Sequence, residues 1–190
     1  MEIKIKSLEP ELIDDFLYFF DNVAFTDNPD WGVCYCHFHH FNGTIKEWSR
    51  RTGEENRNAS GQLILSGKMN GYLAYLGNRP VGWCKADLKK NLPMLLQDKE
   101  LDIHFDGKLG AVVCFIIAHN YRRQGIARKL LQYVCSDFKD NDYDCIEAYP
   151  RKGDKLSDAH QYHGPLSLFD SEGFSIYKEF KEFYIVRKYI

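Results

Sequence analysis

The sequence predicts a mixed α/β (α+β) fold, in which helices flank a central twisted, mixed sheet of about six to seven strands. Short apolar or alternating segments typical of strands recur along the chain, and amphipathic segments typical of helices stand between them. The 190 residues are 44% hydrophobic and 27% charged, the balance of a globular domain with a sizeable core. We therefore expect one domain over residues 1–190.

The N-terminal half is predicted to form a strand, two helical stretches and a hairpin. Apolar and charged residues alternate at the start of the chain, and apolar residues recur at helical spacing after Pro10. Thr44 and Glu47 have the spacing of a capping box, and the turn GNRP separates two apolar runs. The expected elements are a strand at 1–7, a helix at 10–25, a loop at 27–42, a helical stretch at 47–66 and hairpin strands at 72–76 and 81–86.

The C-terminal half contains the clearest segment, AVVCFIIA at residues 111–118. A continuous apolar run with β-branched and aromatic residues is typical of a central strand buried on both faces. An amphipathic helix follows, because five apolar residues fall on one helical face: Ile126, Leu130, Leu131, Val134 and Phe138. The other expected elements are short helices at 94–96 and 164–171 and strands at 143–148, 174–177 and 184–189.

Composition excludes several classes of partner. The net charge is −2 and basic residues are spread along the chain, so no nucleic-acid footprint is visible. No apolar stretch approaches the roughly 18 residues that span a bilayer, and the start of the chain does not resemble a secretion signal. Six irregularly spaced cysteines do not form a disulfide framework. We expect a cytoplasmic protein with reduced thiols and no membrane or nucleic-acid partner.

The segment RRQGIA, residues 122–127, joins the predicted central strand to the amphipathic helix. A helix N-terminus presents unpaired N–H groups and the positive end of the helix dipole, which together bind anions. Gly125 allows close approach of an anion to the backbone, Ala127 keeps the next position small, and Arg122 and Arg123 add positive charge. The pattern is neither a Walker loop nor a dinucleotide fingerprint. A solvated helix start is the alternative interpretation.

In its setting, this segment resembles motif A, R/Q-x-x-G-x-G/A, of the GNAT superfamily of acyl-CoA-dependent N-acyltransferases. The segment PLSLFDSEGFSIY is similar to a second family segment, A-x-x-L-Y-x-x-x-G-F, and the order of elements also agrees. The resemblance therefore covers nearly the whole chain. It implies a substrate wall built by the N-terminal strand and two helices, acyl-CoA binding by residues 109–140, and C-terminal strands with a short helix over 143–190.

The implied reaction moves an acetyl group from acetyl-CoA to a primary amine of a small molecule, peptide or protein, by direct attack in a ternary complex without a metal. By resemblance, the loop residues Arg122, Arg123, Gln124, Gly125, Ile126 and Ala127 surround the coenzyme A pyrophosphate, which binds backbone N–H groups. The resemblance also implies that the end of the strand, Phe115, Ile116 and Ile117, pairs with pantetheine. N–H groups near Ile116 and Ile117 suit the developing oxyanion.

The acid is where the sequence departs from the family, because Phe169 stands where many members carry a tyrosine that protonates the thiolate. Tyr162, with His163 beside it, and Tyr149 are the nearby phenols, and we favour Tyr162 over the alternative of a purely packed side chain. Glu147 is in phase with Tyr149 on its strand and is the candidate base; an exposed strand carboxylate is the alternative.

The stretch VCYCHFHHF, residues 33–41, holds two cysteines and three histidines. Its spacing fits a structural zinc site poorly. The resemblance implies instead a wall of the acceptor pocket, whose aromatic residues suit an amine. Packing for stability alone and a metal-binding regulatory domain on Cys34, Cys36, His37 and His39 remain alternatives. The expected wall residues are Trp31, Cys34, Tyr35, Cys36 and Trp83, with Phe38 and Phe41 nearby.

The missing tyrosine at Phe169 also permits a second function, a coenzyme A sensor or binding module without turnover. The sequence leaves a monomer and a homodimer open.

Overall fold

The computed structural model describes residues 2–153 and 158–190 of the chain. Within this described part of the chain, seven strands form one sheet. They are β1 (Ile3–Ser7), β2 (Tyr72–Leu76), β3 (Arg79–Leu88), β4 (Leu109–Ile117), β5 (Cys145–Ala148), β6 (Ser175–Glu179) and β7 (Tyr184–Tyr189). The α-helices are α1 (Ile13–Asn22), α2 (Ile45–Trp48), α3 (Gly53–Leu65), α4 (Pro93–Leu96), α5 (Ile126–Asp140) and α6 (Leu166–Ser171). The predicted mixed α/β class is confirmed.

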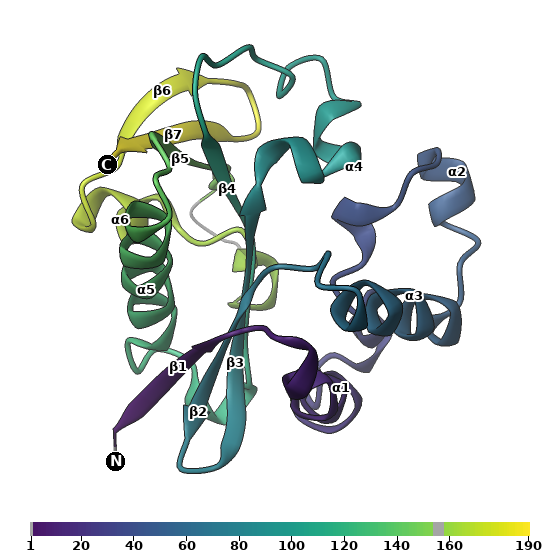
Figure 1. The fold of residues 1–190 in the computed structure, drawn as a ribbon. Helices are drawn as coiled ribbons and strands as arrows, with labels where there is room; N and C mark the ends of the chain where they lie inside the picture. Colours follow the sequence, from purple (N-terminus) through teal and green to yellow (C-terminus); the bar gives the residue numbers. More distant parts are fainter. Residues whose placement is uncertain (1, 154–157) are drawn as a thin grey trace.

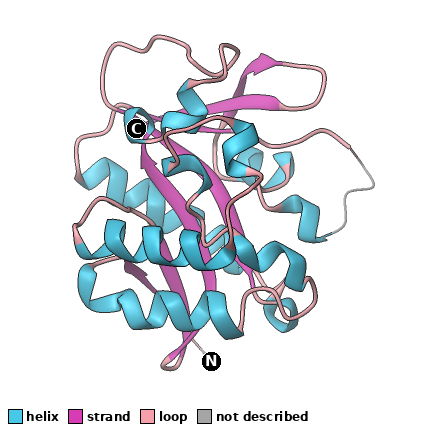
Figure 2. Cartoon of the chain, turned by 90° about the vertical axis from the view of Figure 1, so that its right-hand side faces the viewer, coloured by secondary structure: helices cyan, strands magenta, loops and turns pink. Residues whose placement is uncertain are grey.

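The strands lie in the order β1-β2-β3-β4-β5-β7-β6, and helices cover both faces of the sheet (Figure 1). The α1 and α3 helices pack on one face, where they run across the strands (Figure 2), and α5 packs on the other. The five apolar residues predicted on one face of α5 are all buried. On the opposite face Phe16, Phe19 and Trp83 are fully buried. The sheet therefore separates two apolar cores.

The β5 strand covers only part of β4. The two strands are parallel and α5 connects them. Pairing runs from Leu109 opposite Cys145 to Val112 opposite Ala148, where β5 ends. The last five residues of β4, 113–117, continue past the end of β5, so the sheet opens at this point.

The predicted helical stretch at 47–66 is two helices rather than one. Thr44 and Glu47 form the predicted capping box at α2, but α2 ends at Trp48. Thr52 and Glu55 form a second capping box that begins α3. Because the Thr52 side chain accepts a hydrogen bond from the backbone N–H of Glu55, the chain restarts a helix there.

None of the described helices is both long and apolar enough to cross a bilayer.

Candidate active site

Gly125 is the N-cap of α5 and has a left-handed backbone with φ of 80°. A Cβ at this position would meet no atom within 4 Å, so the space in front of the helix is open. That space is a cavity of about 670 Å³, here called the α5 groove. Its lining comes from the end of β4, the 122–127 loop and the start of α6: Phe115, Ile117, Tyr121, Arg122, Arg123, Gly125, Ile126, Ala127, Arg128, Gln161, Gly164, Pro165, Ser167 and Leu168.

Arg122 holds the loop to the rest of the domain. Its Nε donates a hydrogen bond of 3.0 Å to the Ile117 carbonyl, and its Nη1 lies 2.6 Å from a carboxylate oxygen of Asp27. The hydrogen bond from Arg122 lowers the pKa of Asp27. Gln124 donates to the carbonyl of Asn120. Because these two side chains are turned to protein carbonyls and a carboxylate, the remaining candidate donors for an anion are the backbone N–H groups at the start of α5 and the side chains of Arg123 and Arg128, which also line the groove.

The direction of the β4 backbone decides which of its N–H groups face the opening. Ala118 N–H donates to Val81 on the β3 side, at 3.0 Å. Alternate residues of a strand point the same way, so the N–H of Ile116 also faces β3, and those of Phe115 and Ile117 face the open side. Phe115 N–H already donates to the carbonyl of Tyr162, at 2.6 Å. Ile117 N–H is therefore the donor that β4 turns toward the groove.

The residues 161–164 lie against the exposed end of β4 and divide two cavities. Gln161 and Gly164 line the α5 groove, whereas Tyr162 and His163 line a second cavity of about 650 Å³, here called the α4 cavity. Its lining is largely apolar and aromatic: Phe38, His39, Ile45, Met94, Leu95, Gln97, Asp98, Leu101, Tyr149, Arg151, Tyr162, His163, Glu182 and Phe183. A groove and a cavity thus meet across one short segment.

Tyr162 lies between the α4 cavity and a small pocket that shares lining residues with the α5 groove. Besides lining the α4 cavity, it contributes to a small pocket of about 40 Å³ together with Trp31 and the three end residues of β4, Phe115, Ile116 and Ile117. The Trp31 ring meets the Tyr162 ring edge-on, with 5.9 Å between centroids. Burial raises the pKa of Tyr162, so its phenol is protonated at neutral pH.

Glu147 is fully buried and is held by three side chains. One carboxylate oxygen accepts from Lys89 Nζ and from the Tyr149 hydroxyl, each at 2.7 Å. The other accepts from Arg187 Nε at 2.7 Å. Tyr149 lines the α4 cavity, and burial raises its pKa well above the usual value. The structure therefore brings Tyr149 to the cavity, while Glu147 lies behind it with both oxygens occupied.

The cysteine and histidine stretch packs mostly against the core. Trp83 is fully buried, and its Nε1 donates to the sulfur of buried Cys36, at 3.2 Å. Tyr35 donates its hydroxyl proton to Asp21 on α1, and Cys34 is half-buried. Of the five predicted wall residues, Trp31 is the one whose ring contacts Tyr162. From the same stretch, Phe38 and His39 line the α4 cavity.

The three histidines of this stretch are neutral. Burial lowers the pKa of His37 to about 4 and the pKa values of His39 and His40 to about 3. Within residues 2–153 and 158–190, no group of three or more His, Cys, Asp or Glu side chains is arranged to hold a metal ion. The α4 cavity is thus bordered by an uncharged imidazole, that of His39.

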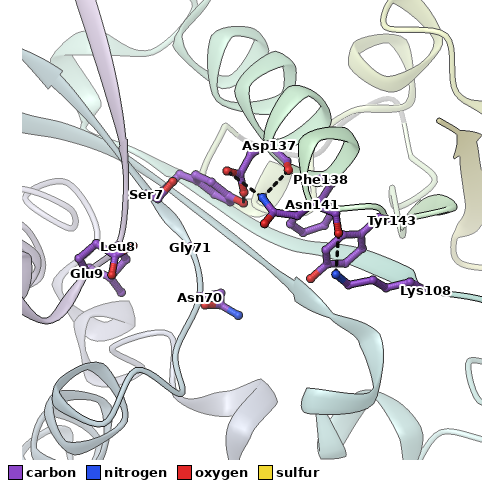
Figure 3. A pocket seen from close by; sticks show the side chains of 11 residues that line it. Ser7, Leu8, Glu9, Asn70, Gly71, Lys108, Asp137, Phe138, Asn141 and Tyr143 are labelled. Carbon is purple, nitrogen blue, oxygen red and sulfur yellow. Dashed lines mark hydrogen bonds between the residues drawn. The ribbon is translucent and has the colours of Figure 1, made fainter.

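Another hollow, of about 270 Å³, lies at the C-terminal end of α5, away from the groove (Figure 3). Several of its polar groups are already paired with one another: Lys108 Nζ donates to the Asn141 carbonyl at 2.6 Å, and Tyr72 donates to Asp137 at 2.7 Å. These pairings leave it without the converging donors of the α5 groove.

The fold and these cavities define a class of mixed α/β domains in which the open start of a helix lies beside the exposed end of a central strand. The sequence model of the acetyltransferase (GNAT) family matches residues 32–159. Because the match covers more than half of the chain, the protein belongs to the GNAT acetyltransferase family. The resemblance drawn from the motifs is confirmed. A comparison with proteins of curated function finds no match.

Solved structures agree with the fold. A PaiA N-acetyltransferase from Thermoplasma acidophilum, in complex with coenzyme A, is 13% identical, with full coverage of both chains (100% and 100%) and a TM-score of 0.58. An acetyltransferase from Thermus thermophilus is 12% identical over 100% of this chain and 98% of its own, with a TM-score of 0.55. The NatC complex bound to Gag peptide and coenzyme A contains a chain that is 15% identical, with coverage of 100% and 99% and a TM-score of 0.57. At these identities the likeness shows the fold.

Sequence reasoning gave no role to Arg151 or His163, both of which line the α4 cavity. Arg151 lies over the Tyr162 ring, 5.9 Å from its centroid, and His163 hydrogen-bonds to β4. In the sequence, only the position of His163 next to Tyr162 pointed to it. Its contact with the Val113 carbonyl on β4 could not be predicted from the sequence of the loop.

Proposed function

We propose that the protein is an N-acetyltransferase that moves the acetyl group of acetyl-CoA to a primary amine of a small molecule, peptide or protein, in a ternary complex. The observation that carries this proposal is the meeting of the α5 groove and the α4 cavity at residues 161–164, beside the exposed end of β4. A thioester in the groove and an amine in the cavity would then lie on the two sides of this short segment, both close to the exposed end of β4.

The α5 groove suits coenzyme A. Its mouth carries the open space at Gly125 and the N-terminal N–H groups of α5, which fit a pyrophosphate. Further in, the Ile117 N–H faces the open side of β4 and suits either the pantetheine or the developing oxyanion. Acetyl-CoA is thus the expected co-substrate, and the described donors need no metal to hold it.

Tyr162 is the proposed acid. As the amine nitrogen forms its bond to the thioester carbon, the carbon–sulfur bond breaks and its electron pair goes to sulfur. The Tyr162 hydroxyl, which is protonated at neutral pH, supplies the proton that the thiolate takes up. Tyr149 is the second candidate for this role. The sequence predicts that Glu147 accepts the amine proton, but Lys89, Tyr149 and Arg187 already occupy both of its carboxylate oxygens.

The test is a thiol-release assay with acetyl-CoA and a panel of polyamines, amino acids, aminoglycosides and peptides. We expect Tyr162→Phe to lower kcat by about 100-fold, the usual worth of a positioned acid, while acetyl-CoA binding is unchanged. Tyr149→Phe distinguishes the second phenol, and Tyr18→Phe, at an exposed position on α1, is the matched control. Wild-type kcat in Tyr162→Phe would rule out Tyr162 as the acid.

A coenzyme A sensor without turnover is the alternative function, and one observation favours it. Phe169 stands at the position of the usual family tyrosine and has no hydroxyl to act as an acid. Its ring is fully buried and contacts Phe115 and Phe174, as expected for a packing residue. Steady release of coenzyme A with any amine would exclude the sensor. A cytoplasmic location stays a prediction, and both a monomer and a homodimer are compatible with the proposal.

A further inference from the structure

We propose that Nε2 of His163 accepts the proton that the acceptor amine loses as it attacks the thioester. This inference rests on the proposed acetyltransferase function and names the second proton-transfer residue of the same site. The proposal requires that His163 contacts the amine substrate directly in the α4 cavity and does not act through another residue.

The hydrogen bond of His163 to β4 decides which ring nitrogen is free. Nδ1 lies 3.1 Å from the carbonyl oxygen of Val113. A carbonyl only accepts hydrogen bonds, so Nδ1 carries the proton and Nε2 presents a lone pair when the ring is neutral. Among the described residues, no hydrogen-bond partner lies at Nε2. The ring therefore offers an unpaired acceptor at the wall of the α4 cavity.

The surroundings keep this imidazole neutral. Burial and the nearby Arg151 guanidinium lower the pKa of His163 to about 4. The other ionisable groups at the cavity are His39 from the 38–40 turn, Tyr162 and Tyr149, with the carboxylates of Asp98 and Glu182. A neutral ring is the form that accepts a proton. The ammonium group of the tetrahedral intermediate is more acidic than a free ammonium group, which eases its proton transfer to a ring of low basicity.

His163 and Tyr162 then divide the two proton transfers. Their rings lie side by side, with 4.2 Å between centroids, at the boundary of the α5 groove. The amine nitrogen bonds to the carbonyl carbon and releases its proton to Nε2 of His163, while the departing sulfur takes a proton from the Tyr162 hydroxyl. The products are the amide and free coenzyme A thiol, and exchange with water restores both side chains.

Two substitutions separate a base from a packed side chain. His163→Asn places its amide near the position of Nδ1, so it can keep the bond to the Val113 carbonyl, but it has no atom in place of Nε2. His163→Gln can place its amide oxygen near Nε2, where it accepts a hydrogen bond but takes no proton. We expect both variants to lose about 100-fold in kcat with acetyl-CoA binding unchanged. A kcat within about threefold of wild type in either folded variant would overturn the proposal.

A second measurement uses the wild-type protein and so does not depend on the variants folding. With ¹⁵N-labelled histidine, the Nε2 resonance of His163 is followed by NMR while phenethylamine is added in the presence of coenzyme A, which allows binding without transfer. We expect the resonance to move on addition of the amine, as it does when a lone pair accepts a hydrogen bond. An unmoved resonance in a protein that turns over phenethylamine in the thiol-release assay would overturn the role of His163 and leave the acetyltransferase proposal standing.

The opposite result separates the two proposals as well. A wild-type protein that releases no thiol with any amine refutes the acetyltransferase proposal and the proton transfer by His163 together. If the Nε2 resonance still moves when phenethylamine is added, the result supports amine binding in the α4 cavity without any acetyl transfer.

Discussion

Glu147 shows how burial changes what one residue contributes. Its carboxylate is fully buried and accepts hydrogen bonds from Lys89, Arg187 and Tyr149. Because two cations share one carboxylate inside the protein, loss of its charge would leave both cations without compensation. At the residue scale, Glu147 thus neutralises two buried cations and orients the Tyr149 hydroxyl.

Glu147→Gln should therefore lower the free energy of unfolding by about 3 kcal/mol, the cost of breaking a buried ion pair from one side. Urea unfolding followed by circular dichroism measures this. Glu179→Gln is the matched control, because Glu179 pairs with Lys152 at the surface and should change stability by less than about 1 kcal/mol. Equal effects of the two substitutions would contradict the buried-pair account.

At the scale of elements, the start of α5 combines a backbone requirement with an open space. Gly125 adopts φ of 80° and nothing lies within 4 Å of the position a Cβ would take. Gly77, in the turn between β2 and β3, has a similar φ of 61° and is equally open, but it lies outside the α5 groove. Substitutions at the two glycines therefore distinguish the effect of backbone strain from the effect of blocking a ligand in the groove.

Gly125→Ala and Gly77→Ala should each cost about 1 kcal/mol of stability, since both place a Cβ in a left-handed conformation. Only Gly125→Ala should weaken acetyl-CoA binding, by about tenfold, because its methyl group stands between the α5 N–H groups and the pyrophosphate. Isothermal titration with acetyl-CoA measures this. A similar loss of affinity in both variants would show that strain, rather than the groove, is responsible.

At the scale of the whole molecule, buried neutral histidines tie stability to pH. The pKa values of His37 and His163 are lowered to about 4 and those of His39 and His40 to about 3, mainly by burial. Between these values and the usual value near 6.5, the unfolded chain binds protons that the folded chain does not. Stability therefore rises with pH through this window and falls as pH is lowered.

We expect the free energy of unfolding to fall steadily from about pH 7 to about pH 5, with each of these histidines adding up to about 1.4 kcal/mol per pH unit once its unfolded form is protonated. Urea unfolding at a series of pH values tests this. His163→Asn should reduce the slope, whereas His104→Gln, with a side chain 85% exposed, should leave it unchanged. A slope that His163→Asn does not alter would contradict a neutral, buried imidazole.

Features that depend on neighbours along the chain could be predicted from the sequence alone. The order of strands and helices, the apolar face of α5, the first capping box and the glycine loop all follow from local spacing, and the confirmed GNAT family follows from these motifs. Periodicity and capping act within a few residues, so a sequence displays them directly.

Which partners the polar side chains of the site contact depends on tertiary packing. Lys89 reaches Glu147 across 58 positions of sequence, and His163 reaches Val113 across 50. A residue's spacing on its own strand or loop shows neither contact, because strand pairing and chain packing bring these partners together. The occupied oxygens of Glu147, the burial of Trp83 and the free Nε2 of His163 therefore became visible only in the folded chain.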